Sequence, residues 1–164
     1  MTSILKLTAV VLAAVFVNGG ELAPGSRGAR IAEAVIDARA ADEPFPHLTE
    51  TRLKVGGTRR RVVVADGSGE RSEGMRRRET LGPYDGMLFA YLEPVQISFT
   101  MSTVPVPLDI AFYDAKGRFV SRLRMEPCAG SEEDCPVYRA DGEFRYALET
   151  LAGDLPRGGL RAAA

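Results

Sequence analysis

The chain has 164 residues, which is the usual size of one domain. Its 21 lysines and arginines nearly balance 22 aspartates and glutamates, so the net charge of −1 gives no electrostatic reason to expect nucleic acid or an anionic membrane as a partner. The 17 glycines and 10 prolines suit short strands joined by tight turns better than long helices.

The first 20 residues have the pattern of a secretory signal peptide. Lys6 precedes the apolar run 7–17, which is too short to span a bilayer. We therefore expect a periplasmic or secreted protein that meets the membrane only during export. The alternative is an uncleaved anchor at the membrane surface. Residues 21–48 are expected to form a flexible linker, because the helical pattern over 31–41 has mostly alanine to bury.

The folded part is expected to begin near Thr49. Polar and apolar residues alternate over 51–55, which predicts a half-buried strand. Gly56-Gly57 is a two-residue hairpin signal, so residues 58–65 are expected to form the partner strand. Residues 66–75 are typical of a turn that leads into a short helix, and a compact apolar strand follows over 86–91.

The most regular strand pattern of the chain covers residues 96–102. Ile97, Phe99 and Met101 fall on one face of it, and polar residues fall on the other. The prolines of Val104-Pro-Val-Pro107 cannot donate to a sheet ladder, so this segment must be an edge or a crossover.

Three further strands are expected after this crossover, over 108–113, 118–125 and 144–149. In the last of them Phe144, Tyr146 and Leu148 should share one face. About seven short strands and one short helix, with turn signals every eight to twelve residues, predict an all-β barrel or sandwich.

The two cysteines, Cys128 and Cys135, are separated by six residues and have no histidine nearby. Zinc binding would need more ligands, and a redox motif would need two intervening residues. A structural disulfide suits the spacing and the predicted export better, because such bonds persist in oxidising compartments. No metal site, cofactor or catalytic residue is predicted.

The central block resembles a family of bacterial and archaeal proteins known as domain of unknown function 192, over roughly residues 50–153. The resemblance implies a compact, jelly-roll-like β-barrel domain over 49–153, followed by a short tail over 154–164, and it implies no known reaction. The segments that carry it are Asp85-Gly-Met-Leu-Phe89, Phe99-x-Met101, Pro107-Leu-Asp-Ile-Ala-Phe112, Asp114-x-x-Gly117, Met125-Glu-Pro-Cys128, Cys135-Pro-x-Tyr138 and Tyr146-Ala-Leu-Glu149.

The chain departs from the family pattern in three places, which makes it a divergent and C-terminally shortened member. Members usually have a Trp before the methionine and Lys-Asn-Thr after it, whereas this chain reads Thr100-Met-Ser-Thr-Val-Pro105. A usual Gly-Leu-Met-Phe run is replaced by Gly74-Met-Arg-Arg-Arg78, and the usual continuation after the last strand is missing. A ligand site of the family would therefore be altered or lost here.

Asp109 is the candidate acid of this block. Leu108 and Ile110 point to one side of the strand, so Asp109 points to the other, after the proline-rich crossover. It could accept a hydrogen bond from a ligand, or it could cap backbone amides near the prolines. Acid–base catalysis needs two carboxyl groups with different pKa values, and the spacing identifies no second one among residues such as Asp85 or Glu126.

The methionines at 75, 87, 101 and 125 lie in or beside the matched segments. They could form a patch for a soft metal or an apolar ligand, or they could fill gaps in a small core.

Three functional hypotheses follow. The first is an exported, non-catalytic module of the cell envelope that binds a small ligand or an envelope protein. The second is an envelope hydrolase that uses Asp109. The third is a degenerate structural paralogue that has lost the family site. The binding face expected for the first consists of Met87, Phe99, Met101, Pro107 and Asp109.

Overall fold

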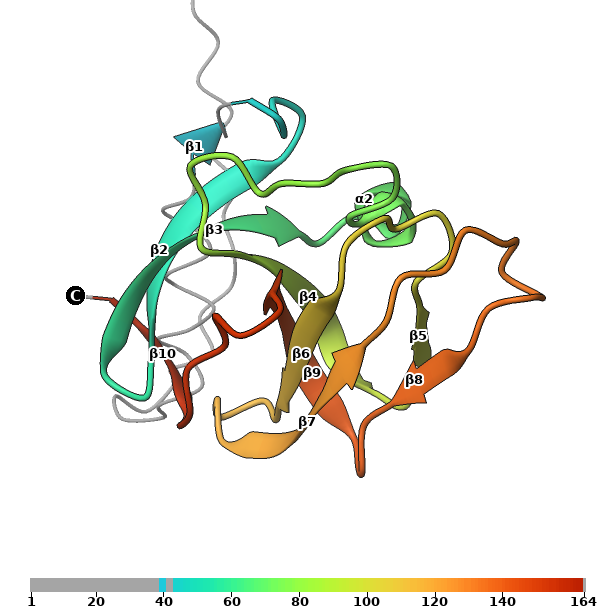
Figure 1. Cartoon of the computed structure of the whole chain (residues 1–164). Coiled ribbons are helices and arrows are strands. Elements are labelled where there is room, and N and C mark those ends of the chain that lie inside the picture. Colours follow the sequence, from blue (N-terminus) through green and yellow to red (C-terminus); the bar gives the residue numbers. More distant parts are fainter. Residues whose placement is uncertain (1–38, 41–42, 164) are drawn as a thin grey trace, which may run out of the picture.

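The computed structural model describes residues 39–40 and 43–163 (Figure 1). The expected signal peptide and most of the expected linker lie outside the described residues. The described part is mostly β, which confirms the predicted fold class. Its elements are β1 (Arg39–Ala40), β2 (Thr49–Val55), β3 (Thr58–Ala65), α2 (Ser68–Glu73), β4 (Gly86–Val95), β5 (Ser98–Thr100), β6 (Leu108–Tyr113), β7 (Phe119–Met125), β8 (Val137–Arg139), β9 (Phe144–Leu151) and β10 (Leu160–Ala162).

Eight strands form one curled sheet in the order β1-β2-β3-β4-β9-β6-β7, and β10 also pairs with β2. A second sheet contains only β5 and β8, which lie on one side of the large sheet, with α2 near one end of them (Figure 1). Strands β3 and β4 are parallel, and a parallel pair needs a long crossover. The segment between them supplies this crossover and carries α2, whose Arg71 donates a hydrogen bond to the Ala90 carbonyl in the middle of β4.

The hairpin between β2 and β3 forms as the sequence predicted. Gly56 and Gly57 have φ values of 58° and 94°, a conformation that two-residue hairpin turns require and that glycine adopts without a steric penalty. The register then pairs Val55 with Thr58 and Thr49 with Val64.

The central strands are buried on both faces and separate two apolar cores. In β4, Met87 and Phe89 join the first core, and Leu88 and Ala90 join the second. This explains why these strands are continuous apolar runs rather than alternating ones, as is usual for strands covered on both sides. The first core lies between the large sheet, the small sheet and the segments that join them.

Two strand predictions need correction. Strand β5 has only three residues instead of the expected seven, because its single partner is the three-residue β8. In β9, Phe144 does not share a face with Tyr146 and Leu148: it packs in the first core and the other two pack in the second. The pairing of β9 with β4 shifts register at this point, and the ring of Phe144 lies 4.8 Å from that of Phe112.

Residues on both sides of the expected domain also pack into it. Phe45 and Leu48, from the expected linker 21–48, are buried in the first core, where Phe45 meets Tyr84 edge to face. The expected tail contains β10, and its Leu160 is buried in the second core. Short edge strands of this kind are stabilised by their partner strand, so their own sequence hardly signals them.

Candidate functional site

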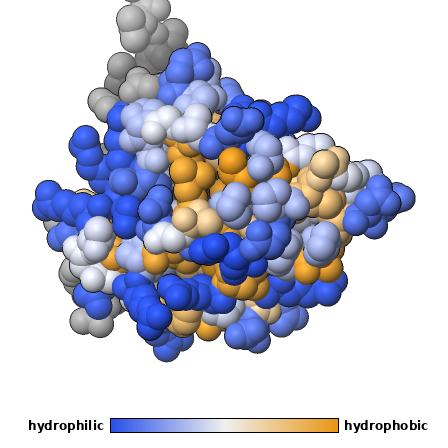
Figure 2. Space-filling model, in the orientation of Figure 1, coloured by the Kyte–Doolittle hydropathy of each residue, from blue (hydrophilic) through white to orange (hydrophobic). Residues whose placement is uncertain are grey.

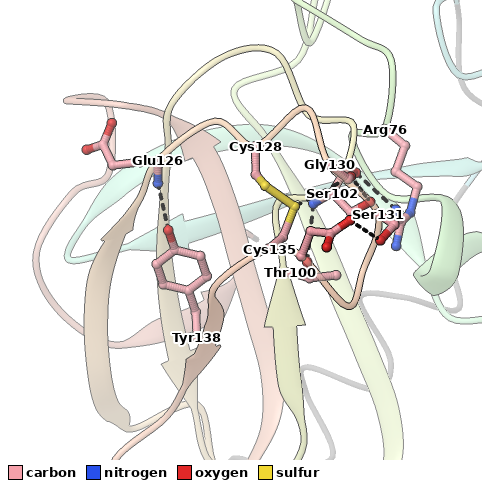
Figure 3. The surroundings of a disulfide bond; sticks show 10 residues. Arg76, Thr100, Ser102, Glu126, Cys128, Gly130, Ser131, Cys135 and Tyr138 are labelled. Atoms are coloured by element: carbon pink, nitrogen blue, oxygen red, sulfur yellow. Dashed lines mark hydrogen bonds between the residues drawn. A yellow bond between two sulfur atoms is a disulfide. The ribbon is translucent and has the colours of Figure 1, made fainter.

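The predicted disulfide joins Cys128 to Cys135, with a Cα–Cα distance of 5.9 Å (Figure 3). Hydrogen bonds attach its loop to the segment after β5. The Ser102 hydroxyl donates to the Gly130 carbonyl at 2.8 Å, and the Thr103 amide donates to the Cys128 carbonyl at 2.8 Å. The disulfide loop, defined as residues 128–135, is therefore fixed beside residues 100–104.

A cavity of about 360 Å³ lies between α2, the large sheet, β5 and the disulfide loop. This volume is at the lower end of the range for small-molecule sites. Its lining combines an apolar wall with a few polar groups. The apolar residues include Met75, Phe89, Phe99, Met101, Val104 and Leu108, and the ionisable or phenolic ones are Arg71, Glu73, Arg76, Tyr91, Glu132 and Glu149.

Glu149 reaches the cavity from the middle of the large sheet. Strand β9 lies between β4 and β6, and the register places Glu149 between Met87 and Ile110, which both face the first core. The residue is 5% exposed, and no hydrogen bond or ion pair to its carboxyl group is found among the described residues. Burial raises the pKa of Glu149 to about 8, so its carboxyl group is mainly neutral at neutral pH.

Two arginines, Arg71 and Arg76, line the cavity. Arg76 donates to the carbonyls of Ser72 and Ser102, each at 2.9 Å, and pairs with Glu132 of the disulfide loop. The ion pair with Glu132 connects the segment after α2 to the disulfide loop. Figure 3 shows Arg76 together with Ser102 and the residues of that loop.

The second arginine, Arg71, holds α2 against β4. It donates to the Ala90 carbonyl at 3.1 Å, and its guanidinium lies 4.8 Å from the centre of the Tyr91 ring. Burial raises the pKa of Tyr91 to about 12, so this phenol stays neutral.

The five residues of the expected binding face are not brought together. Phe99 and Met101 line the cavity. Met87 is fully buried beneath it, in the sheet position next to Glu149. Pro107 is half-buried outside the cavity lining, and its carbonyl accepts a hydrogen bond from the Ala152 amide. Binding by Phe99 and Met101 stays a prediction.

Asp109 lies on the other side of the sheet from the cavity. Leu108 lines the cavity, and consecutive side chains of a strand point to opposite faces. The Asp109 carboxylate accepts hydrogen bonds from Arg124 Nε at 2.5 Å and from the Gly153 amide at 2.7 Å. Partial burial opposes ionisation, but these bonds outweigh it and lower the pKa of Asp109. The side chain thus caps a backbone amide, although of the turn after β9 and not of the proline segment.

The four matched methionines are at most 2% exposed, and all belong to the first core. Their positions suit the filling of a small, irregular core. Met75 and Met101 also form part of the cavity wall. No cluster of His, Cys, Asp or Glu that could hold a metal ion is found in the part of the chain that the structure describes. Within these same residues, no helix is long and apolar enough to cross a membrane.

Sequence reasoning missed Glu149, although it stands in the matched segment Tyr146-Ala-Leu-Glu149. A signal was present. If Tyr146 and Leu148 are buried on one face of a central strand, then Ala147 and Glu149 face the other core. A glutamate at a position buried on both sides is rarely left without a partner, and that makes the position informative.

Comparisons with known proteins support the family and the fold. The profile of the family DUF192, described as "Uncharacterized ACR", matches residues 51–163. A solved protein of unknown function from Novosphingobium aromaticivorans is similar, with 25% identity and a TM-score of 0.60, covering 78% of this chain and 96% of its own.

A second solved structure, a protein from Sinorhizobium meliloti titled a "putative transcription regulator", shares the fold with 24% identity and a TM-score of 0.56. It covers 67% of this chain and 89% of its own. The chain matches no curated protein. Because the family profile spans more than half of the sequence, the chain belongs to the uncharacterised family DUF192.

Proposed function

We propose that this chain is an exported, non-catalytic module that binds a small ligand in the cavity beneath α2. The observation that carries the proposal is a cavity of about 360 Å³ whose lining combines aromatic, thioether and aliphatic side chains with polar ones, and which contains a buried carboxyl group that no other described residue bonds to. Apolar walls with a few convergent polar groups are typical of ligand sites. A carboxyl group in such a wall is costly to bury unless something bonds to it.

The competing hypotheses have less support. A hydrolase that uses Asp109 would need this acid free and beside a second one, but its carboxylate is bound to Arg124 and to the Gly153 amide. A degenerate paralogue would have its site filled by the side chains of Thr100, Ser102 and Val104, with no open cleft. Thr100 and Val104 instead stand in the wall of a cavity, and the Ser102 hydroxyl bonds to the Gly130 carbonyl.

Thermal unfolding with a panel of small metabolites tests the binding proposal. A ligand present at 100 times its Kd should stabilise the fold by about 2.7 kcal/mol, which raises the thermal midpoint measurably. The variant Ser98→Trp places a large ring at the cavity wall and should abolish this shift. Val137→Trp, at an exposed position of the partner strand β8, is the matched control and should retain it. The proposal is wrong if no member of the panel shifts the midpoint.

Export is proposed from the leader-like residues 1–20 together with the Cys128–Cys135 disulfide. Expression in a bacterium, followed by fractionation and intact-mass analysis, tests it. We expect a chain that has lost its leader, is released with the periplasm and resists alkylation until it is reduced. A full-length cytosolic chain with two thiols that alkylate in native buffer would contradict export.

A further inference from the structure

The further inference concerns the chemistry of the ligand and rests on the proposed binding function. Glu149 is 5% exposed and lines the cavity. Within residues 43–163, no described contact satisfies its carboxyl oxygens. Buried polar groups are almost always hydrogen-bonded, and a buried carboxylate is almost always paired. In the described part of the chain, therefore, no group donates a hydrogen bond to Glu149.

The charged side chains around the cavity do not supply that donor. Arg76 is engaged with the carbonyls of Ser72 and Ser102 and with Glu132. Glu73 pairs at 2.7 Å with Arg78, a residue that does not line the cavity. Arg76 is thus paired with Glu132, and Glu73 with Arg78.

Arg71, the other guanidinium in the lining, donates to the backbone carbonyls of Asp66 and Ala90. The remaining ionisable group is Tyr91, whose neutral phenol is a hydrogen-bond donor, but no hydrogen bond from it to Glu149 is found among the described residues. Burial is the cause that raises the pKa of Glu149, so the charges of the arginines do not offset it. The lining holds two arginines and three glutamates, so it carries no excess positive charge that would favour an anionic ligand, whether Glu149 is protonated or not.

The walls next to this group suit an apolar body. Phe89 and Phe99 meet edge to face, with ring centres 5.3 Å apart, and Met75 and Met101 add thioether surface. Aromatic and thioether groups pack against hydrocarbon and also tolerate a nearby cation. The volume restricts the ligand to a small molecule.

We propose that the cavity binds a small apolar amine whose protonated nitrogen donates hydrogen bonds to the carboxylate of Glu149. The pair would satisfy the buried carboxyl group, and the ligand's apolar part would fill the aromatic and thioether wall. An alcohol or a carboxylate can bond to the protonated form of Glu149, but only the ammonium group stabilises its charged form, so proton release distinguishes the amine from the other two.

Proton balance gives the proposal a distinct signature. At neutral pH the amine arrives as an ammonium ion and Glu149 is mainly protonated. Formation of the ion pair releases the carboxyl proton to the buffer, and no covalent bond of the ligand changes. The affinity should therefore rise about tenfold per pH unit between pH 6 and 7.5, and level off above about pH 8.

The test uses isothermal titration calorimetry with three probes of one shape: 2-phenylethylamine, 2-phenylethanol and 3-phenylpropionate. Titrations in two buffers of different ionisation enthalpy measure the protons released. We expect the amine to bind at least about tenfold more tightly than the other two at pH 7.5, with nearly one proton released at pH 6.5.

Two variants complete the test. Glu149→Gln keeps the shape of the side chain and should lower amine affinity at least about tenfold, and it should remove the proton release. Asp109→Asn, on the opposite face of the sheet, should leave both unchanged. If Glu149→Gln does not fold, the proton release of the original chain still decides the matter.

The outcomes separate the two proposals. Binding of the alcohol or the acid as tightly as the amine would overturn the amine inference and leave the binding module standing, as would amine binding without proton release. Failure of all three probes, together with failure of the metabolite panel, would overturn both. Failure of these probes alone would overturn the apolar amine as ligand.

Discussion

Two glutamates of this protein are equally buried, each 5% exposed, and their surroundings differ completely. Glu50 of β2 accepts hydrogen bonds from Arg61 Nε and from the Tyr84 hydroxyl, each at 3.0 Å. The Arg61 guanidinium also lies 4.8 Å from the centre of the Tyr84 ring. Glu149 of β9 faces a cavity and has no such partner among the described residues. Burial alone therefore does not distinguish a structural acid from a candidate site: the partners do.

Figure 2 shows apolar residues among a mainly hydrophilic exterior, which is ordinary for a small domain. The Glu50 cluster, which consists of Glu50, Arg61 and Tyr84, ties β2 and β3 to the segment before β4. Its polar groups bond to one another rather than to a ligand. The backbone of Glu149 is paired within the sheet, but its carboxyl group accepts no hydrogen bond from the described residues.

The largest expected effect is the pH dependence caused by Glu149. Its pKa is raised from 4.5 to about 8 in the folded protein, so between these values the folded state keeps a proton that the unfolded state loses. The contribution of Glu149 to stability should be largest below pH 4.5, fall by up to about 1.4 kcal/mol per pH unit as the pH rises, and level off above pH 8, a total on the order of 5 kcal/mol. Urea unfolding of Glu149→Gln should lack this fall, so the variant should be more stable than the original chain at pH 8.

The second-largest effect is expected when the hydrogen-bonded cluster of Glu50, Arg61 and Tyr84 is disrupted. Glu50→Gln removes the negative charge beside the largely buried Arg61 and should lower the free energy of unfolding by about 3 kcal/mol at pH 7. Tyr84→Phe removes only one hydrogen bond and should cost about 1 kcal/mol. Chemical denaturation measures both. Equal, small effects would mean that the Glu50 cluster is no more structural than the cavity.

The third effect, removal of the disulfide, should loosen only the cavity side. Replacing Cys128 and Cys135 by serine should lower the free energy of unfolding by about 2 kcal/mol, because the unfolded chain is no longer constrained by the short loop. Amide hydrogen exchange should become faster at residues 98–104 and in the disulfide loop. The exchange rates of the amides paired between β2 and β3 should be unchanged once the loss of global stability is subtracted. Equal acceleration in both regions would contradict the proposed separation.

The smallest effect is expected at Asp109, the acid of the opposite face. Its lowered pKa means that it stabilises the fold above the unfolded pKa of 3.8 and that this contribution is lost as the pH falls through the folded value. The partner Arg124 is exposed to solvent, so the contribution is screened. Asp109→Asn should reduce stability slightly above pH 4 and leave the slope between pH 5 and 8 intact. A changed slope in that range would show that Asp109 is coupled to the cavity.

The sequence predicted local features well where local forces decide them. The hairpin at Gly56 and Gly57 follows from turn chemistry, and the Cys128–Cys135 pair follows from spacing and composition. The short strands β8 and β10 were missed because each is stabilised by pairing with a distant strand rather than by its own residues.

The candidate site was predicted only in part. Phe99 and Met101 were identified from their regular alternation, and both line the cavity. Asp109 was placed correctly on the face opposite Leu108, but which face carries the cavity depends on the sheet, the helix and the disulfide loop together. Glu149 was missed because its importance lies in a missing partner, and a sequence does not show partners.

The amino-acid sequence by itself thus determined the all-β class, the family segments and the disulfide, because turn chemistry, alternation and cysteine spacing act over a few residues. The tertiary structure alone decided that Glu50 meets Arg61 and Tyr84 whereas Glu149 meets a cavity. Both glutamates are buried residues in strands of the large sheet. Their different environments arise from segments many residues away, which the curvature and strand order of the sheet bring into contact with one acid and keep away from the other.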